Sequence, residues 1–382
     1  MRTLVLAHMF PHEHNETIGL STFRRTVELA KRCPVMVVSP TSRRDLPEHE
    51  VLGGLDVFRP RWRRIPKIGV FTDGYTYGAA VARVLPRIRG SFDFDVIDSH
   101  WLYPDGFAAT RLGRELRRPV VLTGRGSDVD VLCFHWAVRR RARRALQAAT
   151  RLCALSRAMR DTMVQAGADG ERIDVVPNGV DTERFCPGDR DAARQELGQP
   201  ADGTLLFSCG YMTRDKGFHH LIEGLPSLPD DVRLAMAGFG EEEDALERLA
   251  SERGVADRVT FLGRVAQAAM PLWYRAADFF CFATYHEGCP NTVLEALACG
   301  TPVVSTNVGG VPDLMDGEGL GVLCEPRDTQ AFVDALGSAL ERTWDRAAIA
   351  AHGQKRSWAN VAAECYGVLE RAMVTWNQPH TA

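Results

Sequence analysis

The sequence has no CxxC pair and no Cys/His cluster, although it contains ten cysteines. This scattered spacing suggests neither a zinc site nor a disulfide framework, so we interpret the cysteines as reduced, mostly buried thiols. No run of 18 apolar residues is present either, which argues against a membrane-spanning helix. The first apolar run covers only Leu4 to Ala7, which is too short for a signal-peptide core, so we expect a cytoplasmic protein.

The composition is that of an ordinary globular protein, with 45% hydrophobic and 25% charged residues. At 382 residues the chain is about twice the usual domain size, which predicts two soluble domains. The net charge of −3 is unevenly spread. Residues 1–185 hold 30 Lys/Arg against 21 Asp/Glu, and the remaining residues hold 16 against 28, so the front half is basic and the back half acidic.

Two basic clusters lie in the front half, from Arg59 to Lys67 and from Arg139 to Arg144. The first contains Trp62 and two prolines among its arginines, which indicates an exposed loop. The sequence leaves two interpretations of this cluster open. It contacts an anionic acceptor or the inner face of a membrane, or it is simply solvated. The second is interpreted as a solvated helix face, because the LQAA that follows continues a helical pattern.

Short Val/Ile/Leu-rich runs alternate with longer amphipathic segments along nearly the whole chain. This alternation predicts the α/β class, with parallel sheets covered by helices on both faces. One predicted helix runs from Ser21 to Arg32, capped by Ser21 or Thr22, with Phe23, Val27 and Ala30 on one face. The predicted strands begin at Thr3, Pro34, Asp95, Pro119, Arg151 and Ile173, and then at Thr204, Val232, Arg258, Asp278, Thr301 and Gly321.

The segment 186–203 is rich in Gly, Pro and Asp and is predicted to connect two domains, residues 1–185 and 204–357. Residues 358–382 should form a last helix, which could cross back to the first domain. Two such domains facing each other would create a cleft outside the carboxyl ends of their strands, where open α/β sheets bind ligands.

From Glu287 the chain reads EGCPNTVLEALACGTPVV, with seven residues between Glu287 and Glu295. Asn291 and Thr292 can cap the helix that follows, so that its positive end points toward the preceding loop and suits a phosphate. Glu295 on the first turn and Glu287 on the loop would then flank the anion and accept hydrogen bonds from sugar and ribose hydroxyls. The spacing from Thr292 to Glu295 also fits a capping box, which needs no ligand, so the motif alone leaves both readings open.

Further runs extend the pattern over nearly the whole chain. They are VVPNGVDTERFCP from Val175, RDKG from Arg214, AGFGEEEDALERLA from Ala237, RVTFLGRV from Arg258, YRAADFF from Tyr274 and NVGGVPDL from Asn307. Each run is weak alone, but their order and spacing are specific. Together with the two glutamates they resemble the family 4 glycosyltransferases, a retaining family of the GT-B fold, in which two Rossmann-like domains face each other across a cleft.

The resemblance implies a hexosyltransferase that moves a hexosyl group, with retention, from a UDP- or GDP-sugar to a hydroxyl of a carbohydrate, lipid-linked or small-molecule acceptor. Synthesis of surface polysaccharide or glycoconjugate is the implied role, with no additional cofactor and no nucleic-acid partner. In the family the first glutamate of the motif holds hydroxyls of the donor sugar and the second holds the ribose. Carried to this chain, these residues are Glu287 and Glu295.

The same resemblance assigns the phosphate and donor contacts. Lys216 matches the lysine that neutralises the diphosphate leaving group. Its usual arginine partner is replaced by Tyr211, and Arg214 is the natural substitute. Gly19 lies in a long loop where many members have a Gly-Gly pair, and its missing side chain would let backbone amides approach an anion. The other implied donor contacts are Gly210, Val265, Gly288, Cys289, Pro290, Asn291 and Thr292.

The segment DSHWLYPDG from Asp98 resembles the acceptor-side loop of the family, with His100, Trp101 and Asp105 facing the cleft. Many members have a histidine where this chain has Arg125. An arginine stays protonated and cannot act as a general base, but it can bind a carboxylate, hydroxyl or phosphate. Some branches that build surface polysaccharides also read RGxD here, and Asp128 is expected to orient Arg125.

Three alternatives remain against this interpretation. Asp128 and Asp130 form a DxD, which binds a metal in the other large glycosyltransferase fold, but the resemblance to GT-B predicts no metal dependence. AGFGEEEDAL resembles a dinucleotide fingerprint, yet its third glycine is absent and three glutamates at the helix start would repel a pyrophosphate. A non-catalytic protein that binds a sugar nucleotide or a partner stays open, because Tyr211 and Arg125 depart from the family pattern.

Overall fold

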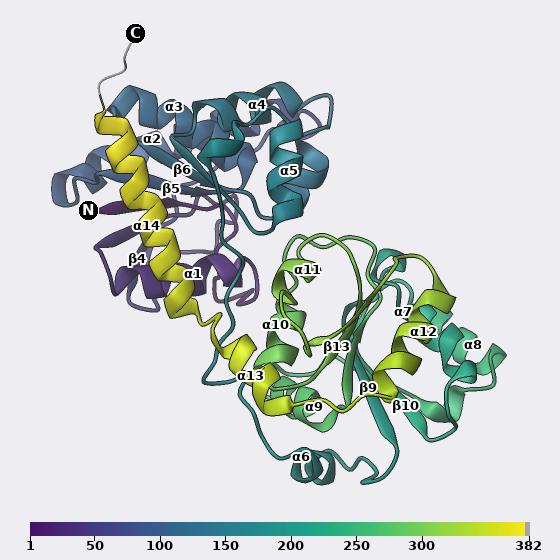
Figure 1. Cartoon of the computed structure of the whole chain (residues 1–382). Helices are drawn as coiled ribbons and strands as arrows, with labels where there is room; N and C mark the ends of the chain where they lie inside the picture. Colours follow the sequence, from purple (N-terminus) through teal and green to yellow (C-terminus); the bar gives the residue numbers. More distant parts are fainter. Residues whose placement is uncertain (379–382) are drawn as a thin grey trace. The chain divides into compact units, whose positions relative to one another are not determined.

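The computed structural model describes residues 1–378, apart from the side chain of Leu132, and these residues form two compact units. Unit 1 consists of Met1–Asn178 together with the chain from Trp358 onward, and unit 2 consists of Gly179–Ser357. Figure 1 shows a sheet with its covering helices in each unit. The units divide after Asn178, and the segment 186–203 carries a short helix, α6 (Arg190–Glu196), that packs on α9 (Met270–Ala276) of unit 2.

Unit 1 is built on an eight-stranded sheet with the order β3-β4-β2-β1-β5-β6-β7-β8. All neighbouring strands are parallel except β3 and β4, which pair as an antiparallel hairpin at the edge. The strands are β1 (Thr3–Leu6), β2 (Val35–Val38), β3 (His49–Leu52), β4 (Leu55–Phe58), β5 (Val96–His100), β6 (Val120–Thr123), β7 (Arg151–Ala154) and β8 (Ile173–Val175).

The helices of unit 1 cover both faces of this sheet. They are α1 (Leu20–Ala30), α2 (Gly69–Ser91), α3 (Phe107–Leu116), α4 (Arg139–Ala148), α5 (Arg157–Gln165) and α14 (Trp358–Asn377). The last helix, α14, packs along α1 and against β5, β6 and β7, although more than 170 residues of unit 2 precede it in the chain. Its apolar side buries Val361, Cys365, Val368 and Leu369 in one core cluster with Val96 and Val121 of the sheet.

In unit 1 the predicted cap of α1 is wrong, and one hairpin was not anticipated. The helix α1 begins at Leu20 and is capped by the backbone of Gly19, without a side-chain cap from Ser21 or Thr22. Its most deeply buried positions are Thr22, Arg25, Thr26 and Leu29, and the predicted face of Phe23, Val27 and Ala30 packs, partly buried, on the core cluster of β1 and β2. The β3–β4 hairpin was not predicted, because HEVL and LDVF are short and carry charged residues.

Unit 2 contains a six-stranded, fully parallel sheet with the order β11-β10-β9-β12-β13-β14. Every strand predicted for this half is present, which confirms the α/β class. The strands are β9 (Thr204–Tyr211), β10 (Val232–Phe239), β11 (Val259–Gly263), β12 (Phe279–Phe282), β13 (Val303–Thr306) and β14 (Gly321–Cys324). Side chains of β9 and β12 alternate between two core clusters, one on each face of the sheet.

Helices pack on both faces of this sheet as well (Figure 1). Besides α6 and α9 they are α7 (Phe218–Gly224), α8 (Glu243–Glu252), α10 (Asn291–Ala298), α11 (Val311–Leu314), α12 (Thr329–Leu340) and α13 (Arg346–Gln354). On one face, α9, α10 and α13 bury Tyr274, Leu297 and Ile349, and on the other, α7 and α12 bury Ile222 and Leu336. Because all strands of this sheet are parallel, their carboxyl ends lie at one edge of the sheet.

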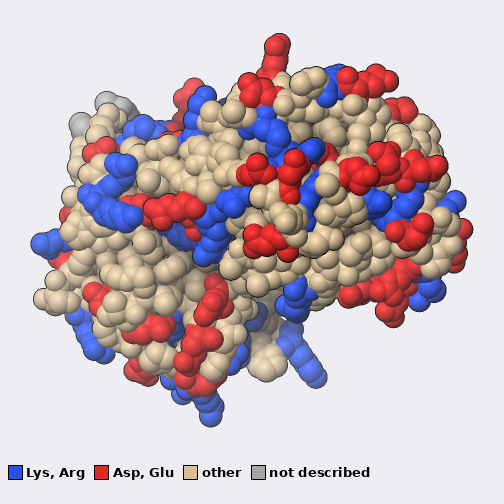
Figure 2. Space-filling model, turned by 90° about the horizontal axis from the view of Figure 1, so that it is seen from below, with Lys and Arg blue, Asp and Glu red and all other residues tan. Residues whose placement is uncertain are grey.

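The two basic clusters differ in their surroundings. The guanidinium of Arg59 is buried, with its Nε 2.5 Å from Glu50 Oε1, and Trp62 is only 7% exposed. The prediction of an exposed loop is therefore wrong at these two residues, whereas residues 63–67 of the run are exposed. The cluster from Arg139 to Arg144 lies on α4. On the face drawn in Figure 2, Lys and Arg are interspersed with Asp and Glu. Within residues 1–378, none of the helices is long and apolar enough to cross a membrane.

Candidate active site

Three neighbouring strands of unit 2 direct the predicted donor residues to one edge of the sheet. β9 is followed by the turn Arg214–Lys216, β12 by the loop that carries Glu287, and β13 by the loop Asn307–Gly310. These strands lie in the order β9-β12-β13. The chain continues from β9 to β10 on one side while β12 occupies the other, so β9 and β12 flank a topological switch point, where open α/β sheets bind ligands.

Lys216 and Glu287, which are 71 residues apart in sequence, meet at this point. The ammonium group of Lys216 donates to Oε1 of Glu287, and the two side chains are 25% and 15% exposed. Burial raises the pKa of Glu287, and the charge of Lys216 opposes this shift. The pair therefore provides a cation and a carboxylate in a partly dry place, where electrostatic interactions are stronger than in water.

Glycines let the backbone pack closely around this pair. Gly309 has φ +54°, and a Cβ on it would lie 1.6 Å from the carbonyl oxygen of Glu287. Gly310 donates its N–H to the same carbonyl at 3.3 Å. On the other side, Gly217 has φ +68°, and a Cβ there would lie 1.9 Å from the carbonyl oxygen of Ala283. The loops after β9, β12 and β13 thus fix the backbone at Lys216 and Glu287.

The helix after the glutamate loop is not capped in the way that the sequence predicted. α10 begins at Asn291 with Pro290 in the capping position, and no side chain caps it. The hydroxyl oxygen of Thr292 is buried and has no hydrogen-bond partner among the described residues. The capping box from Thr292 to Glu295 is therefore absent, and Glu295 is the fifth residue of the helix, on its second turn and not its first. The backbone N–H groups of the first turn have no carbonyl acceptors within their own helix.

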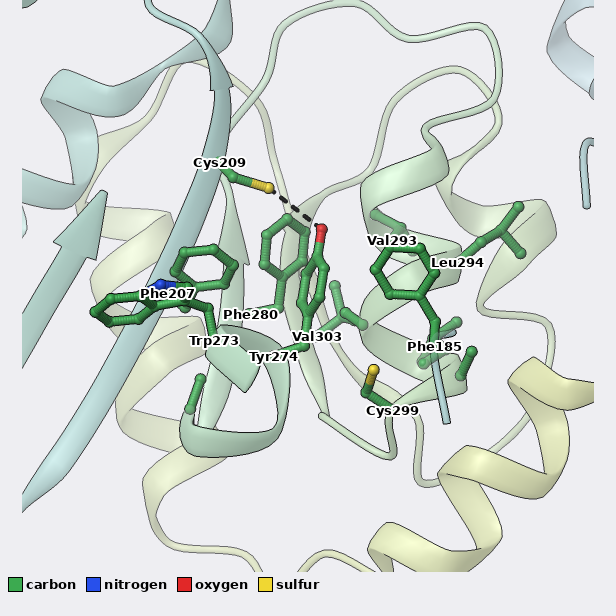
Figure 3. Close-up of a cluster of buried hydrophobic side chains, with 14 of the residues drawn as sticks. Phe185, Phe207, Cys209, Trp273, Tyr274, Phe280, Val293, Leu294, Cys299 and Val303 are labelled. Atoms are coloured by element: carbon green, nitrogen blue, oxygen red, sulfur yellow. Dashed lines mark hydrogen bonds between the residues drawn. The ribbon is translucent and has the colours of Figure 1, made fainter. Parts of the chain in front are cut away.

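A buried tyrosine binds the second glutamate. Tyr274 of α9 donates its hydroxyl to Oε2 of Glu295 at 2.9 Å. The hydroxyl oxygen of Tyr274 also lies 3.2 Å from Sγ of Cys209 on β9. Figure 3 shows Tyr274 directed at Cys209 between Phe207, Phe280 and Val303. Burial holds the pKa of Tyr274 well above its ordinary value, so the hydroxyl stays a donor. This contact fixes one carboxylate oxygen of Glu295.

The remaining predicted donor residues lie at or near the same edge. Gly210 is the penultimate residue of β9, and Gly238 of β10 packs so closely on it that a Cβ there would lie 1.9 Å from the carbonyl oxygen of Gly210. Gly288 and Cys289 are half-buried between Glu287 and the start of α10, and Pro290 is buried. Val265 follows β11 and packs on the core cluster of Tyr274 and Phe280.

Arg214 and Tyr211 are both exposed. Arg214 begins the turn that ends with Lys216, so a second positive charge lies two residues before the lysine. The ring of Tyr211 is 51% exposed and lies edge-on to Phe239 at 5.1 Å.

A hydrogen-bonded network that the sequence did not reveal supports the lysine turn. The hydroxyl of Tyr285 lies 3.0 Å from Nε2 of His219 and 2.8 Å from Nε2 of His220, both on α7. The backbone N–H of Tyr285 donates to the carbonyl of Asp215 at 2.8 Å. Burial lowers the pKa of His219 to about 4, with a smaller contribution from His220. The tandem histidines after RDKG were the available signal for this network.

In unit 1 the predicted residues Arg125 and His100 belong to a buried cluster. Nε2 of His100 lies 2.7 Å from Nη2 of Arg25, and Nδ1 of His100 lies 2.5 Å from Nη2 of Arg125. Arg25 also donates to Asp98 at 2.5 Å, whereas none of the ion pairs among residues 1–378 includes Arg125. A neutral imidazole has one lone pair, so it can accept from only one of the two guanidinium groups. Arg25 lies on α1, outside every recognised motif, and could not be identified as a site residue from the sequence.

The positive charges in this cluster set its pKa values. Burial and the charges of Arg25 and Arg125 lower the pKa of His100 to about 3, so the imidazole is neutral. Burial and repulsion from Arg25 lower the pKa of Arg125 to about 9, and it remains protonated at neutral pH. Arg125 as a whole is half-buried, its guanidinium also donates to Oδ1 of Asn178 at 3.3 Å, and a protonated guanidinium can bind an anionic or hydroxyl group.

Asp128 holds the loop around Arg125 by backbone contacts. Its Oδ1 accepts the N–H groups of Arg125 and Gly126, each at 2.9 Å, and its Oδ2 accepts from Leu102 at 2.8 Å. Asp128 was predicted to orient the side chain of Arg125. The correction is that it holds the backbone of Arg125 instead. Burial raises the pKa of Asp128 to about 6.

Asp105 and His100 are both 0% exposed, which corrects the expectation that their side chains face an open cleft. Asp105 accepts from the backbone N–H of His8 at 2.7 Å and from its ring Nδ1 at 2.5 Å. The His8 ring lies edge-on to Trp101, which is half-buried and has φ +76°. His8 was missed, because nothing in the sequence links it to a residue 97 positions later. In the loop after it, Gly19 has φ +64°, and a Cβ there would lie 2.1 Å from the carbonyl oxygen of Met9.

Comparison with known proteins gives a family for both units. The profile of glycosyl transferases group 1 matches residues 189–356, and that of glycosyltransferase family 4 matches residues 21–184. A Bacillus subtilis glycosyltransferase assigned to teichuronic acid biosynthesis, TuaC, is 30% identical over 79% of this chain and 76% of its own length. A D-inositol 3-phosphate glycosyltransferase of Mycobacteroides abscessus is 36% identical over 56% of this chain and 49% of its own length.

Solved structures show the fold. Sucrose-phosphate synthase from Thermosynechococcus elongatus has a TM-score of 0.77 and 20% identity over 98% of this chain and 99% of its own. The Anabaena protein HepE in complex with UDP has a TM-score of 0.76 and 20% identity over 97% of this chain and 99% of its own. The predicted resemblance is thus confirmed, and the chain belongs to the group 1, family 4 glycosyltransferases of the GT-B fold, an enzyme of the hexosyltransferase class.

Proposed function

We propose that the chain transfers a hexosyl group from a nucleoside diphosphate sugar to an acceptor hydroxyl with retention of configuration, in the synthesis of a surface polysaccharide or glycoconjugate. The observation that carries the proposal is the meeting of Lys216 and Glu287 at the switch point of the unit 2 sheet. A diphosphate needs a cation, and a sugar needs a hydrogen-bond acceptor, and this pair supplies both from fixed loops.

Each donor residue has a role in this proposal. The donor would enter with its diphosphate at Lys216 and the nearby Arg214, so that the Lys216 ammonium turns from Glu287 to the phosphate. Glu287 would then accept hydroxyls of the hexose, and Glu295, held by Tyr274, would accept the ribose hydroxyls. The buried, unpartnered hydroxyl of Thr292 at the start of α10 offers one further hydrogen bond to the donor. The solved complexes of HepE with UDP and with UDP-glucose support a UDP-sugar as donor.

In unit 1, Arg125 would bind a hydroxyl or an anionic group of a substrate, while the buried His100 and Asp98 keep Arg25 and Arg125 in position. Trp101 would contact the acceptor, and the backbone amides of the loop at Gly19 would approach the anionic part of the donor. The name of the inositol phosphate relative indicates that an acceptor in this family can carry a phosphate. The role in polysaccharide synthesis is supported by the teichuronic acid relative.

The proposed reaction breaks the bond between C1 of the hexose and the β-phosphate oxygen and forms a bond from C1 to the acceptor oxygen on the same face. The proton of the acceptor hydroxyl goes to the departing phosphate oxygen, so no side-chain base is required. The charge that develops on the phosphate is stabilised by Lys216 and Arg214, without a metal ion. The DxD aspartate Asp128 has both carboxylate oxygens engaged by backbone amides, which supports a role in holding its loop.

A thermal-shift panel of UDP, GDP, ADP, TDP, their hexoses and NAD tests the donor assignment. A ligand that binds the folded state raises the melting temperature, so a nucleoside diphosphate and its hexose should do so and NAD should not. A shift with NAD alone would contradict the proposal and favour an oxidoreductase. Once the donor is known, NMR of the product should show the anomeric configuration of the donor, and an inverted product would refute retention.

A further inference from the structure

The outer surface of α2, α3 and α4 in unit 1 carries exposed aromatic side chains. The side chain of Trp136 is 70% exposed, that of Phe134 49% and that of Tyr75 45%. The ring of Phe71 lies edge-on to Trp136 at 5.4 Å, which joins the start of α2 to the loop before α4. Large apolar side chains gathered in one exposed place are typical of an interaction surface.

Arginines surround these rings. On α4 the positions Ala142, Ala145 and Leu146 are buried, so the arginines between them face outward. The exposed arginines of this helix are Arg139, Arg140, Arg143 and Arg144. All but Arg143, which lies beside Gly167, line the hollows between the helices. The guanidinium groups of Arg111 on α3 and Arg141 on α4 lie over the ring of Tyr75, at 5.3 and 5.7 Å from its centre.

The surface is hollowed between the helices. One hollow of about 420 Å³ lies between Tyr75, Phe107, Arg111, Arg114 and Arg144. A second, of about 470 Å³, shares Tyr75 and Arg144 and extends to Trp136. Among the described residues that line these two hollows there is no Asp or Glu. Their walls therefore combine positive charge with aromatic rings, which suits the phosphate of a head group.

We propose that this surface, called here the arginine–aromatic face, binds a lipid bilayer that carries anionic head groups. Arginines gain from the negative surface potential of such a bilayer, and exposed Trp, Tyr and Phe side chains enter the boundary between head groups and acyl chains. A soluble polyanion would engage only the arginines and would leave Trp136 and Phe134 in water. The bilayer is the partner that accounts for both kinds of side chain.

This inference does not depend on the proposed glycosyl transfer, because the hollows lie in unit 1 on helices that carry none of the site residues. It also differs from the sequence-based membrane hypothesis, which rested on the run from Arg59 to Lys67. Two members of that run, Arg59 and Trp62, are buried, and only residues 63–67 of it are exposed.

Co-sedimentation of the full chain with vesicles tests the proposal. We expect binding to phosphatidylcholine vesicles that contain phosphatidylglycerol and little binding to phosphatidylcholine alone. Replacing Arg139, Arg140, Arg143 and Arg144 by glutamine should lower the partition coefficient at least about tenfold, because each charge near the surface contributes to binding. The matched control replaces four exposed arginines of unit 2 by glutamine, namely Arg184, Arg233, Arg248 and Arg342.

A second measurement separates bilayer contact from binding of any polyanion. Brominated lipids should quench the tryptophan emission of the bound protein, and Trp136→Phe should remove most of this quenching. Trp376→Phe, at a residue 37% exposed on α14, should leave it unchanged. Circular dichroism and thermal melting establish that the variants are folded.

Several outcomes would overturn the proposal. They are no binding to anionic vesicles, equal loss of binding in the unit 2 control, quenching that survives Trp136→Phe, and binding to heparin or RNA without binding to vesicles. Loss confined to the α4 variant, together with quenching that depends on Trp136, supports it.

Discussion

At the scale of single residues, Lys216 is the position where charge matters most for the proposed transfer. Its ammonium group is held by Glu287 in a partly buried place. Lys216→Ala should lower turnover by a factor on the order of 100 or more, because the leaving diphosphate loses its main stabilising charge. Steady-state kinetics with the donor identified by thermal shift provides the measurement.

Lys355→Ala is the matched control, since Lys355 is an exposed lysine of the same unit. It should leave turnover unchanged. Near-normal turnover of Lys216→Ala would mean that the phosphate lies elsewhere.

His219 should make the stability of the fold depend on pH. Burial holds its pKa at about 4, below the value of 6.5 expected in an unfolded chain, so between these pH values the unfolded state binds a proton that the folded state does not. The free energy of unfolding should therefore fall as the pH drops from 6.5 to 4, by about 3 kcal/mol from this residue.

Urea unfolding of the wild type and of His219→Asn at pH 7.5 and 4.5 measures this effect. The variant should lose less stability between the two pH values than the wild type, whereas the exposed His14→Asn should behave as the wild type. Equal pH dependence in all three proteins would show that His219 is not buried as a neutral ring.

At the scale of elements, the loop after β13 fixes the backbone of the glutamate loop. Gly309→Ala places a side chain at φ +54° and drives its Cβ against the carbonyl oxygen of Glu287. Gly263→Ala, at φ +60° with no atom within 4 Å of the added Cβ, is the matched control for backbone strain alone.

The strain common to both substitutions costs about 1 to 2 kcal/mol. Gly309→Ala should destabilise the protein by more than this and should also lower turnover, whereas Gly263→Ala should leave turnover near normal. Thermal unfolding and kinetics of both variants compare the two effects. Identical behaviour would mean that the contact with Glu287 has no part in the activity.

Most strands of both sheets could be predicted from the sequence because a buried parallel strand is a short apolar run, rich in Val, Ile and Leu or, in β12, in Phe. The edge hairpin β3–β4 could not, since its exposed positions carry charged residues. The helix α10 was predicted in the right place, but its cap was not, because Pro290 takes the position that Asn291 or Thr292 was expected to fill.

Some of the site residues could likewise be predicted from the sequence, and others could not. Lys216 and Glu287 each follow a predicted strand, so their convergence at one sheet edge could be anticipated from the motif order. The partners Arg25, His8 and Tyr274 could not, because their contacts join residues far apart in sequence and depend on how helices pack on the sheet. Long-range packing therefore supplies the residues that position the site, and local sequence supplies those proposed to contact the donor.

At the scale of the whole molecule, the last helix joins a unit that the chain left at Asn178. Val368 of α14 is 1% exposed in the core of unit 1, whereas Val374 on the same helix is 61% exposed. Val368→Asp buries a carboxylate without a partner and should destabilise unit 1 by about 4 kcal/mol or more, while Val374→Asp should have little effect.

Differential scanning calorimetry with and without the nucleoside diphosphate distinguishes the units. In Val368→Asp the transition of unit 1 should move to lower temperature, while the ligand still stabilises unit 2. Loss of ligand binding together with the shift would contradict the division of the chain into these two units.

The most direct test of the proposed activity is formation of product by the Glu287→Ala variant. With labelled donor and an acceptor-containing cell extract, the wild type and the exposed control Glu318→Ala should form the same glycosylated product, and Glu287→Ala should form at least about 100-fold less. Equal product from Glu287→Ala and the wild type would contradict the assignment of the donor site to Lys216 and Glu287.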